Sequence, residues 1–405
     1  MIQLYKMAYR DLGRNRRRSF FSALALAMGL ALLLLIASVV EGEMRGAMES
    51  NIRLNSGHLQ VRAASYNEDK TSLKWEDLIE NPGEMAAEIV ALEPVKVATP
   101  RLFASGIISS NDNTVGVRII GIDPASEANA PFREGMISGD FLTADDRQGI
   151  LLGQPLAEKL NLKAGDTVQL LANTSNGDVD EQPFAVRGVY STHIPGFDEN
   201  TVFMPLLKAQ AITKTENHAS ALFILLKDRA DAAAVAAALP TSQYQVKTWE
   251  QMNELIVQFE QFASAYMKLI YLIILAITAT VIVNTLIMSV YERTREIGIL
   301  AAIGMKGSRI MAMFFAESSL LAVGGILMGL VIGGVLVYYA TNTGFYFGNL
   351  GITGIMIGER IYASLTLSDM ITLTILTFIV ALLAALYPAL LAARMEPVEA
   401  LHSGQ

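Results

Sequence analysis

Cysteine is absent from this 405-residue chain, and charged residues make up only 17% of it. Without cysteine there are no disulfides, thiol nucleophiles or cysteine-ligated metals. The sequence also lacks a GxxxxGK[ST] phosphate loop, an HExxH metal motif and a GxSxG nucleophile elbow. We therefore expect no enzyme activity, no catalytic residues, no metal site and no cofactor on this chain.

Hydrophobic residues are abundant instead, at 52% of the chain. Four apolar runs, at about 19–40, 264–290, 310–340 and 370–393, are each long enough for a hydrocarbon core of about 30 Å. A signal peptide is the alternative for the first run, because arginines precede it. Its apolar part is about twice the usual signal length and no A-x-A site follows, which favours an uncleaved helix. The sequence predicts a four-helix membrane protein.

Charge asymmetry predicts the orientation. Residues 1–18 carry a net charge of +5 and 291–309 a net of +2, whereas 41–267 carry a net of −13. Positive residues favour the cytoplasm. We therefore expect both termini (1–18 and 394–405) and the 291–309 loop to be cytoplasmic. The 41–263 segment and the 341–369 loop would lie outside. Residues 1–18 have one apolar face and predict an amphipathic helix, or alternatively a solvated basic lead-in.

The 41–263 segment has the pattern of a large extracytoplasmic α+β domain, because short alternating runs are interspersed with helical ones. Its expected strands are 57–62, 102–109, 115–122, 167–172, 184–190, 202–204, 221–226 and 244–247. Its expected helices are 82–92, 155–160, 206–213 and 230–238. A helical pattern at 249–263 continues into the second span without a breaker, either to transmit force or simply to overhang the bilayer.

The 291–309 loop is much longer than a simple return into the membrane needs. It combines charged residues with an apolar stripe at helical spacing, Ile297, Leu300, Ala301 and Ile303. The pattern predicts a short helix lying beneath the bilayer and available to a soluble partner.

Three features stand out in the last two spans. Gly325, Gly329 and Gly333 form a small-xxx-small face that lets another helix approach, either from the same chain or from a second subunit. Glu317 lies early in the third span and should face protein or water, or extend its side chain to the interface. Pro388 lies inside the fourth helical pattern and should kink it, whereas Pro397 should stop any helix beyond it.

Four segments together resemble permeases of the MacB/FtsX-like ABC transporter superfamily, and within it the lipoprotein-releasing permeases LolC and LolE. They are the basic lead into the first span with SGHLQV at 56–61 shortly after it, GILLGQPLAEKLNLKAGDTVQLL at 149–171, ERTREIGILAAIGMKGSRI at 292–310 with Glu317 downstream, and YPALLAARMEPVEAL at 387–401. Together they bracket nearly the whole chain, in the expected order and at the expected separations.

The resemblance implies a type VII, mechanotransmission ABC permease. Two permease chains, copies or homologues, would sit on two cytoplasmic ABC ATPase subunits, with ATP and Mg bound there. The 41–263 segment would be a MacB-like periplasmic core domain with a porter-like lobe (about 44–137 and 220–250) and an inserted lobe (about 138–219). The 291–309 segment would be the coupling helix, and its implied ATPase-coupling residues are Glu292, Arg293, Arg295, Glu296, Gly298 and Gly304.

The resemblance also implies a multi-pass protein of the bacterial plasma (inner) membrane that contacts lipids and binds no nucleic acid. Its function would be to extract lipoproteins or similar lipidated cargo from the outer leaflet. Efflux of antimicrobial peptides or other amphiphiles, or an FtsX-like regulator or scaffold role, are the alternatives.

Two further sets of residues are candidates for contacts with cargo and carrier. The cargo face would consist of Met44, Met48, Phe259, Phe262, Tyr266 and Met267, unless these residues only pack helices or lie at the membrane interface. In lipoprotein-releasing permeases a projecting loop docks the periplasmic carrier. Its counterpart here is 173–182, with Asn173, Gly177 and Asp178, which is shorter and more polar than an apolar hook.

Overall fold

The computed structural model describes residues 8, 10, 13, 14, 16–67, 72–110, 113–239, 243–346 and 360–395. Most of the predicted 1–18 helix, much of the 341–369 loop and most of the 394–405 tail, with Pro397, lie outside these residues. The chain divides into two compact units. One unit comprises Met1–Met44, Glu260–Phe345 and Ile361–Gln405, and the other comprises Arg45–Phe259 and Tyr346–Arg360.

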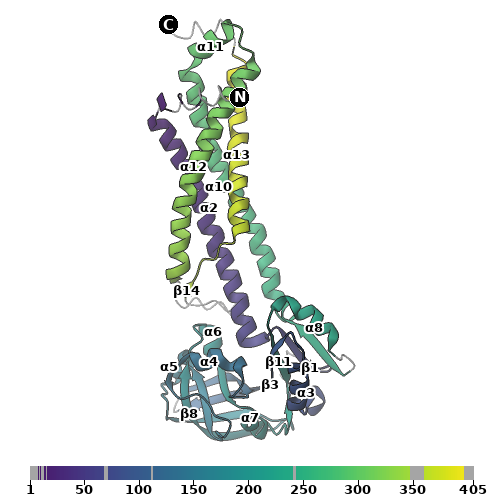
Figure 1. The fold of residues 1–405 in the computed structure, drawn as a ribbon. Helices are drawn as coiled ribbons and strands as arrows, with labels where there is room; N and C mark the ends of the chain where they lie inside the picture. The colour runs from purple at the N-terminus through teal and green to yellow at the C-terminus, as the bar shows by residue number, and fades with distance from the viewer. Residues whose placement is uncertain are drawn as a thin grey trace. The chain divides into compact units, whose positions relative to one another are not determined.

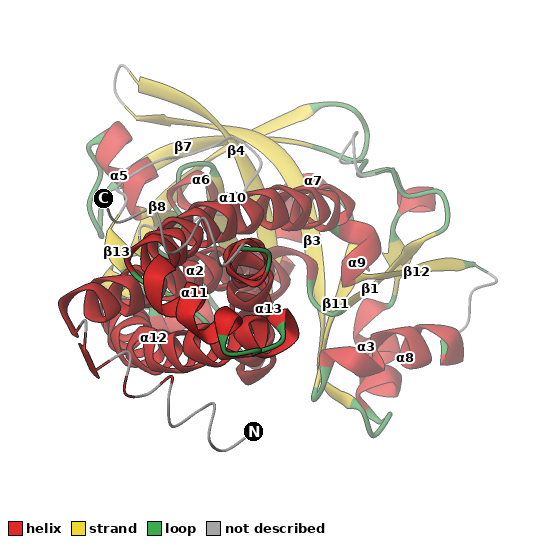
Figure 2. Ribbon diagram, turned by 90° about the horizontal axis from the view of Figure 1, so that it is seen from above, coloured by secondary structure: helices red, strands yellow, loops and turns green. Residues whose placement is uncertain are grey.

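Four long helices make up most of the first unit and run side by side (Figures 1 and 2). They are α2 (Arg16–Asn51), α10 (Glu254–Glu292), α12 (Gly307–Thr343) and α13 (Leu367–Ala393). Each contains a stretch that is long and apolar enough to cross a membrane. All four begin before the apolar runs that predicted them, because polar residues continue a helix wherever no residue breaks it.

Leucine and small side chains pack this bundle. Leu26, Leu30 and Leu34 of α2 form one buried cluster with residues of α12 and α13. The three predicted glycines of α12 face α2: a Cβ on Gly329 would lie 3.0 Å from the carbonyl oxygen of Ala27. Of the two alternatives for this face, the structure therefore has a helix of the same chain. α13 continues through Pro388 to Ala393.

The second unit is built on a sheet of ten strands in the order β12-β1-β11-β3-β4-β9-β6-β8-β5, with β7 paired to β3 and β8. The strands are β1 (Leu59–Ala63), β3 (Val95–Ser110), β4 (Asn113–Ile122), β5 (Met136–Gly139), β6 (Gly149–Gly153), β7 (Thr167–Asn173), β8 (Val179–Tyr190), β9 (Thr201–Pro205), β11 (Ala221–Leu226) and β12 (Tyr244–Thr248). Two short pairs are separate: β2 (Ile79–Glu80) with β10 (His218–Ala219), and β13 (Phe345–Tyr346) with β14 (Arg360–Ile361).

Short helices cover the sheet. They are α3 (Pro82–Val90), α4 (Ala130–Glu134), α5 (Gln154–Leu160), α6 (Pro195–Asp198), α7 (Leu206–Thr213), α8 (Ala232–Ala238) and α9 (Trp249–Met252). One-turn helices occupy Trp75–Asp77, Glu127–Asn129 and Arg229–Asp231. The expected α+β domain is thus present, and the sheet runs through both predicted lobes. β6 is buried along its whole length. Its sequence, GILLG, has no alternation, so periodicity did not identify it as a strand.

The predicted unbroken helix over 249–263 was wrong. α9 ends at Met252, and Asn253 adopts φ −115° and ψ 31° before α10 begins at Glu254. The Asn253 side chain donates to the carbonyl oxygen of Trp249 at 2.6 Å and to Oγ of Ser56 at 3.1 Å. Asparagine interrupts the helix because its amide competes with the backbone for hydrogen bonds.

Candidate coupling site

A separate short helix, α11 (Thr294–Ala302), connects α10 to α12. Backbone hydrogen bonds at Gly304 and Met305 determine where α11 ends. The N–H of Gly304 donates to the carbonyl of Ala301, and the N–H of Met305 donates to that of Leu300, both at 3.0 Å. This is the Schellman arrangement, which places residue 304 in a left-handed conformation. Gly304 has φ +95°, and a glycine adopts this conformation without steric cost.

The inner face of α11 is fixed by a buried ion pair. Arg293 Nη1 lies 3.3 Å from Glu317 Oε2 of α12, and both side chains are less than one-tenth exposed. Arg293 also lies over the ring of Phe314, and Ile297 is buried one turn further along. Glu317 therefore faces protein instead of reaching out to the interface. The buried pair holds α11 against the start of α12.

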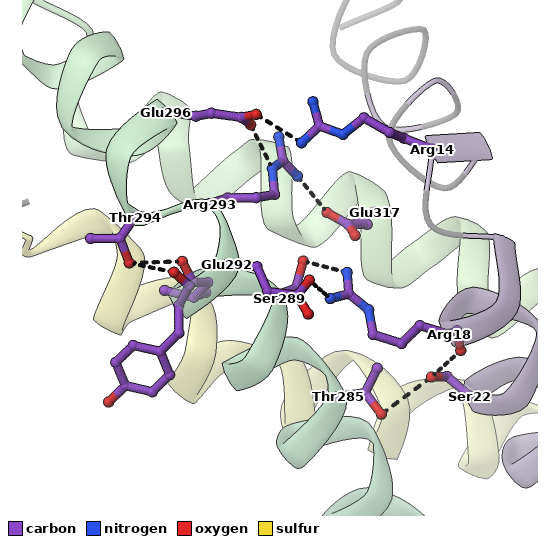
Figure 3. A network of polar contacts seen from close by, with 12 residues as sticks. Arg14, Arg18, Ser22, Thr285, Ser289, Glu292, Arg293, Thr294, Glu296 and Glu317 are labelled. Carbon is purple, nitrogen blue, oxygen red and sulfur yellow. Dashed lines mark hydrogen bonds and ion pairs between the residues drawn. The ribbon is translucent and has the colours of Figure 1, made fainter. Parts of the chain in front are cut away.

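Two arginines complete the network shown in Figure 3, Arg14 just before α2 and Arg18 in its first turn. Arg14 Nη2 lies 2.8 Å from Glu296 Oε1, and Arg293 Nε lies 3.1 Å from the other oxygen of the same carboxylate. Arg18 pairs with Glu292 and donates to Ser289 Oγ at 2.9 Å. Burial raises the pKa of Glu296, but hydrogen bonds from Arg293 and Arg14 outweigh it, so the net shift is downward. The network thus joins α2, α10, α11 and α12.

The outer face of α11 is apolar and exposed. Arg295, Ile299 and the C-cap residue Ile303 follow one another at four-residue intervals, which places them on one side of the helix, and Tyr291 lies in the last turn of α10 just before it. The exposed fractions of Tyr291 and Ile303 are 61% and 79%. Isolated exposed isoleucines need no explanation, but two of them in line with an arginine suit a protein partner.

The six predicted coupling residues therefore divide into three groups. Arg295 and Gly304 are exposed and available to a partner. Glu292 and Glu296 form ion pairs with Arg18 and Arg14, respectively. Arg293 and Gly298 are buried and support the helix from within, so we do not expect them to touch a partner.

Sequence reasoning missed the tertiary partners of this site. It identified Arg14 and Arg18 only as orienting charges, and it did not identify Tyr291 and Ile299 as an exposed face. Four-residue spacing from Tyr291 was the available signal. Nothing in the sequence could indicate that Arg14 pairs with Glu296, 282 positions away.

The candidate cargo residues have different environments and are divided between the two units. Met44 and Met267 line a groove of about 420 Å³ between α2, α10 and α13. Phe262 and Tyr266 are exposed on α10, whereas Met48 is buried in a small cluster with Ile52 and Ile256. Phe259 is about half exposed.

The groove itself is mainly apolar. Besides the two methionines, its walls include Ala37, Val40, Ala263, Tyr271, Leu373 and Leu376. Glu41, Glu260, Lys268 and Asp369 add charged groups. A mainly apolar groove with charged groups of both signs suits an amphiphilic ligand.

The predicted carrier-docking loop is a short hairpin. Asn173 ends β7 and pairs with Val179, the first residue of β8. The turn between them is closed by hydrogen bonds from Thr174 to the carbonyl of Asp178, and Gly177 has φ +82°. Only the residues between the two strands form a loop, so little chain projects from the sheet.

Comparison with known families supports the identity of this architecture. The family described as MacB-like periplasmic core domain matches residues 19–242, more than half of the chain. The FtsX-like permease C-terminal family matches residues 268–397, which include α11. The chain belongs to the MacB/FtsX family of ABC transporter permeases.

Individual relatives agree with this assignment. The lipoprotein-releasing system transmembrane protein LolC of Neisseria meningitidis is 25% identical, with 96% of this chain and 95% of that protein covered. LolE of Haemophilus influenzae is 22% identical, with 95% and 94% covered. The macrolide export ATP-binding/permease protein MacB of a Shewanella species is 21% identical over 99% of this chain but only 60% of its own length.

Proposed function

We propose that this permease couples ATP hydrolysis on separate ABC ATPase subunits to movement of its periplasmic domain. The exposed face of α11 supports this proposal most directly. Its exposed isoleucines with Arg295 offer a docking surface, and the ion pairs of Arg14, Arg18 and Arg293 beside it connect the two ends of this junction to α2 and α12. A push on α11 would pass into two membrane-spanning helices through charged contacts instead of through a flexible loop.

The ATPase would lie on another chain. No phosphate loop occurs in the 405 residues. The chain matches LolC over 95% of that protein but MacB, whose name includes ATP-binding, over only 60%. In this proposal two ATPase subunits and a second permease, a copy or a homologue, form a type VII complex. α11 and both termini would be cytoplasmic.

We propose lipoproteins or similar lipidated proteins of the outer leaflet as cargo. The names of LolC and LolE support this choice, and so does the mainly apolar groove lined by Met44 and Met267. Acyl chains gain about 0.8 kcal/mol per buried methylene group, so such a groove could hold part of a lipid anchor. Efflux of amphiphiles is the second candidate, favoured by relatives named for macrolide and syringafactin export.

A matched pair of variants tests the cargo. Ala263 lines the groove, whereas Ala265, two positions later on α10, is exposed outside it. Each alanine is replaced by tryptophan in the tagged full-length chain. Proteins retained after gentle detergent purification from the native membrane are then identified by mass spectrometry.

We expect acylated lipoproteins with the unmodified chain and with Ala265→Trp, and several-fold fewer with Ala263→Trp. An ATPase retained without lipoproteins in every sample would contradict lipoprotein extraction and favour efflux. Equal lipoprotein recovery from both variants would argue against the groove as the binding site.

A further inference from the structure

One face of the sheet in the periplasmic unit carries an unusual group of arginines. Cross-strand partners place their side chains on the same face of a sheet. Gln60 of β1 pairs with Phe223 of β11, and Phe223 pairs with Thr99 of β3. Side chains two positions apart in a strand point to the same face, so Arg62 lies on this face with Gln60, and Arg101 lies on it with Thr99.

The third arginine follows in the same way. Ser105 continues the alternation along β3 and pairs with Arg118 of β4. Three positively charged side chains from three strands thus lie on one face.

The deepest of the three is structural. Arg101 is fully buried, donates to the carbonyl of Leu54 at 2.8 Å and stacks 3.6 Å from the ring centre of Phe223. Its Nε has no hydrogen-bond partner among the described residues. Burial, followed by the charge of Arg118, lowers the pKa of Arg101 to about 9. Arg118 is therefore near enough to Arg101 for the two positive charges to repel each other.

The other two arginines line a cavity of about 190 Å³. Arg62 is oriented by Gln60, whose side-chain oxygen accepts from Arg62 Nε at 2.9 Å and from Nη2 at 2.6 Å. The amide nitrogen of Gln60 is itself held by the carbonyls of Asn55 and Ser56. A buried arginine fixed in this way is pre-organised for a ligand.

Arg118 faces the same cavity without a partner. Its guanidinium makes no hydrogen bond or ion pair with any described residue and only lies 5.7 Å from the ring centre of Phe197. The eight described residues that line the cavity include no aspartate or glutamate. A buried or half-buried guanidinium without a counter-charge is costly, so an anion from solution would stabilise it.

We propose that this cavity binds a phosphate group between Arg62 and Arg118. Guanidinium groups match phosphate oxygens in a bidentate geometry, and the cavity exceeds the space that a single water needs. The phosphate could belong to a phospholipid headgroup or to free phosphate. The site is distinct from the groove lined by Met44 and Met267, and it does not depend on the proposed cargo.

Calorimetric titration of the purified full-length protein in a maltoside detergent tests this proposal. The probes are inorganic phosphate and dihexanoyl phosphatidylglycerol, at constant ionic strength. We expect at least one probe to bind and Arg118→Gln to weaken its affinity about tenfold or more. Arg187→Gln, at a surface arginine of the same domain, should leave it unchanged. Binding of both probes indicates a general phosphate site, whereas binding of the lipid alone indicates a headgroup site.

A second variant keeps the proposal testable if Arg118→Gln does not fold. Met252 lines the cavity, and its sulfur lies 4.0 Å from Arg62 Nη2. Met252→Glu adds a carboxylate that should occupy the site and abolish phosphate binding. Circular dichroism and gel filtration check the fold of each variant. Absence of binding by either probe to the unmodified protein, or equal affinity in the unmodified protein and a folded Arg118→Gln or Met252→Glu variant, would overturn the proposal.

Discussion

Arg293 and Glu317 illustrate how much a single residue pair determines in this permease. Both side chains are buried, whereas Glu296, which also contacts Arg293, is about half exposed. The sequence indicated that Glu317 must face protein, water or the interface, because a carboxylate near a membrane is costly. It did not identify Arg293 as the partner, since the pairing depends on how α11 folds back.

Glu317→Ala should destabilise the protein by about 2–3 kcal/mol, because it removes the buried carboxylate that faces Arg293 and leaves the half-exposed Glu296 beside that charge. Arg293→Met combined with Glu317→Leu should cost clearly less than the sum of the single variants. Thermal unfolding of the purified full-length chain measures both. Glu292→Ala is the control, since its exposed pair with Arg18 is worth at most about 1 kcal/mol. Additive losses in the double variant would contradict a mutually dependent pair.

Asp198 of the periplasmic unit predicts a pH dependence. Burial raises its pKa to about 6, although Thr192 and Ser191 donate hydrogen bonds to it. Because the folded-state pKa lies above the ordinary value near 4, the contribution of Asp198 to stability is fully present below pH 4. It is lost as the pH rises through about 6.

Asp198→Asn should remove this contribution. The unfolding temperature of the unmodified protein, minus that of the variant, should then fall between pH 4 and pH 7. Thermal unfolding across this range measures the difference. A constant or rising difference would contradict the raised pKa.

At the scale of helices and strands, periodicity carried most of the prediction. The four apolar runs, the 291–309 helix and the glycine face of the third span could all be read from spacing. The break at Asn253 and the strand at Gly149–Gly153 could not. The break depends on a hydrogen bond from Asn253 to Ser56, which lies 197 positions earlier in the chain. The strand is a short apolar run, and only the elements packed around such a run decide whether it forms a strand or a helix.

The glycine face gives a matched pair of variants within one helix. A Cβ on Gly325 would lie 2.9 Å from the carbonyl oxygen of Ala23, whereas a Cβ on Gly324 would meet nothing within 4 Å. Gly325→Ala should therefore cost about 1–3 kcal/mol by pushing α2 away from α12. Gly324→Ala should be neutral or slightly stabilising, because alanine favours a helix. Thermal unfolding measures both, and equal effects would mean that α2 does not pack there.

Gly304 tests the end of α11. Gly304→Ala should strain the backbone by about 1–2 kcal/mol, because φ is +95° there. Gly304→Asn should be milder, since asparagine tolerates the left-handed region better. If α11 docks the ATPase, the alanine variant should retain less ATPase after purification than the asparagine variant. Equal recovery of ATPase from both variants would show that the C-terminal cap does not position the docking face.

At the scale of the whole molecule, family membership explains the architecture, whereas the exposed face of α11 and the ion pairs beside it come from the structure. α11 presents Arg295, Ile299 and its C-cap Ile303 outward, and ion pairs at its N-terminal end connect it to Arg14, just before α2, and to α12. The sequence predicted that this segment contacts a soluble partner. It could not show which side does so, because charged residues lie on both sides and only the tertiary pairs decide which are free.

The most direct test of this account is recovery of the ABC ATPase with the tagged full-length chain, measured by quantitative mass spectrometry. We compare the unmodified chain with the double variant Ile299→Asp and Ile303→Asp. Leu207→Asp, at a residue that is 73% exposed on the periplasmic unit, is the matched control. The account predicts that the ATPase is lost at least tenfold in the double variant alone, with the permease still folded. Full recovery of the ATPase with that variant would contradict the coupling role of α11.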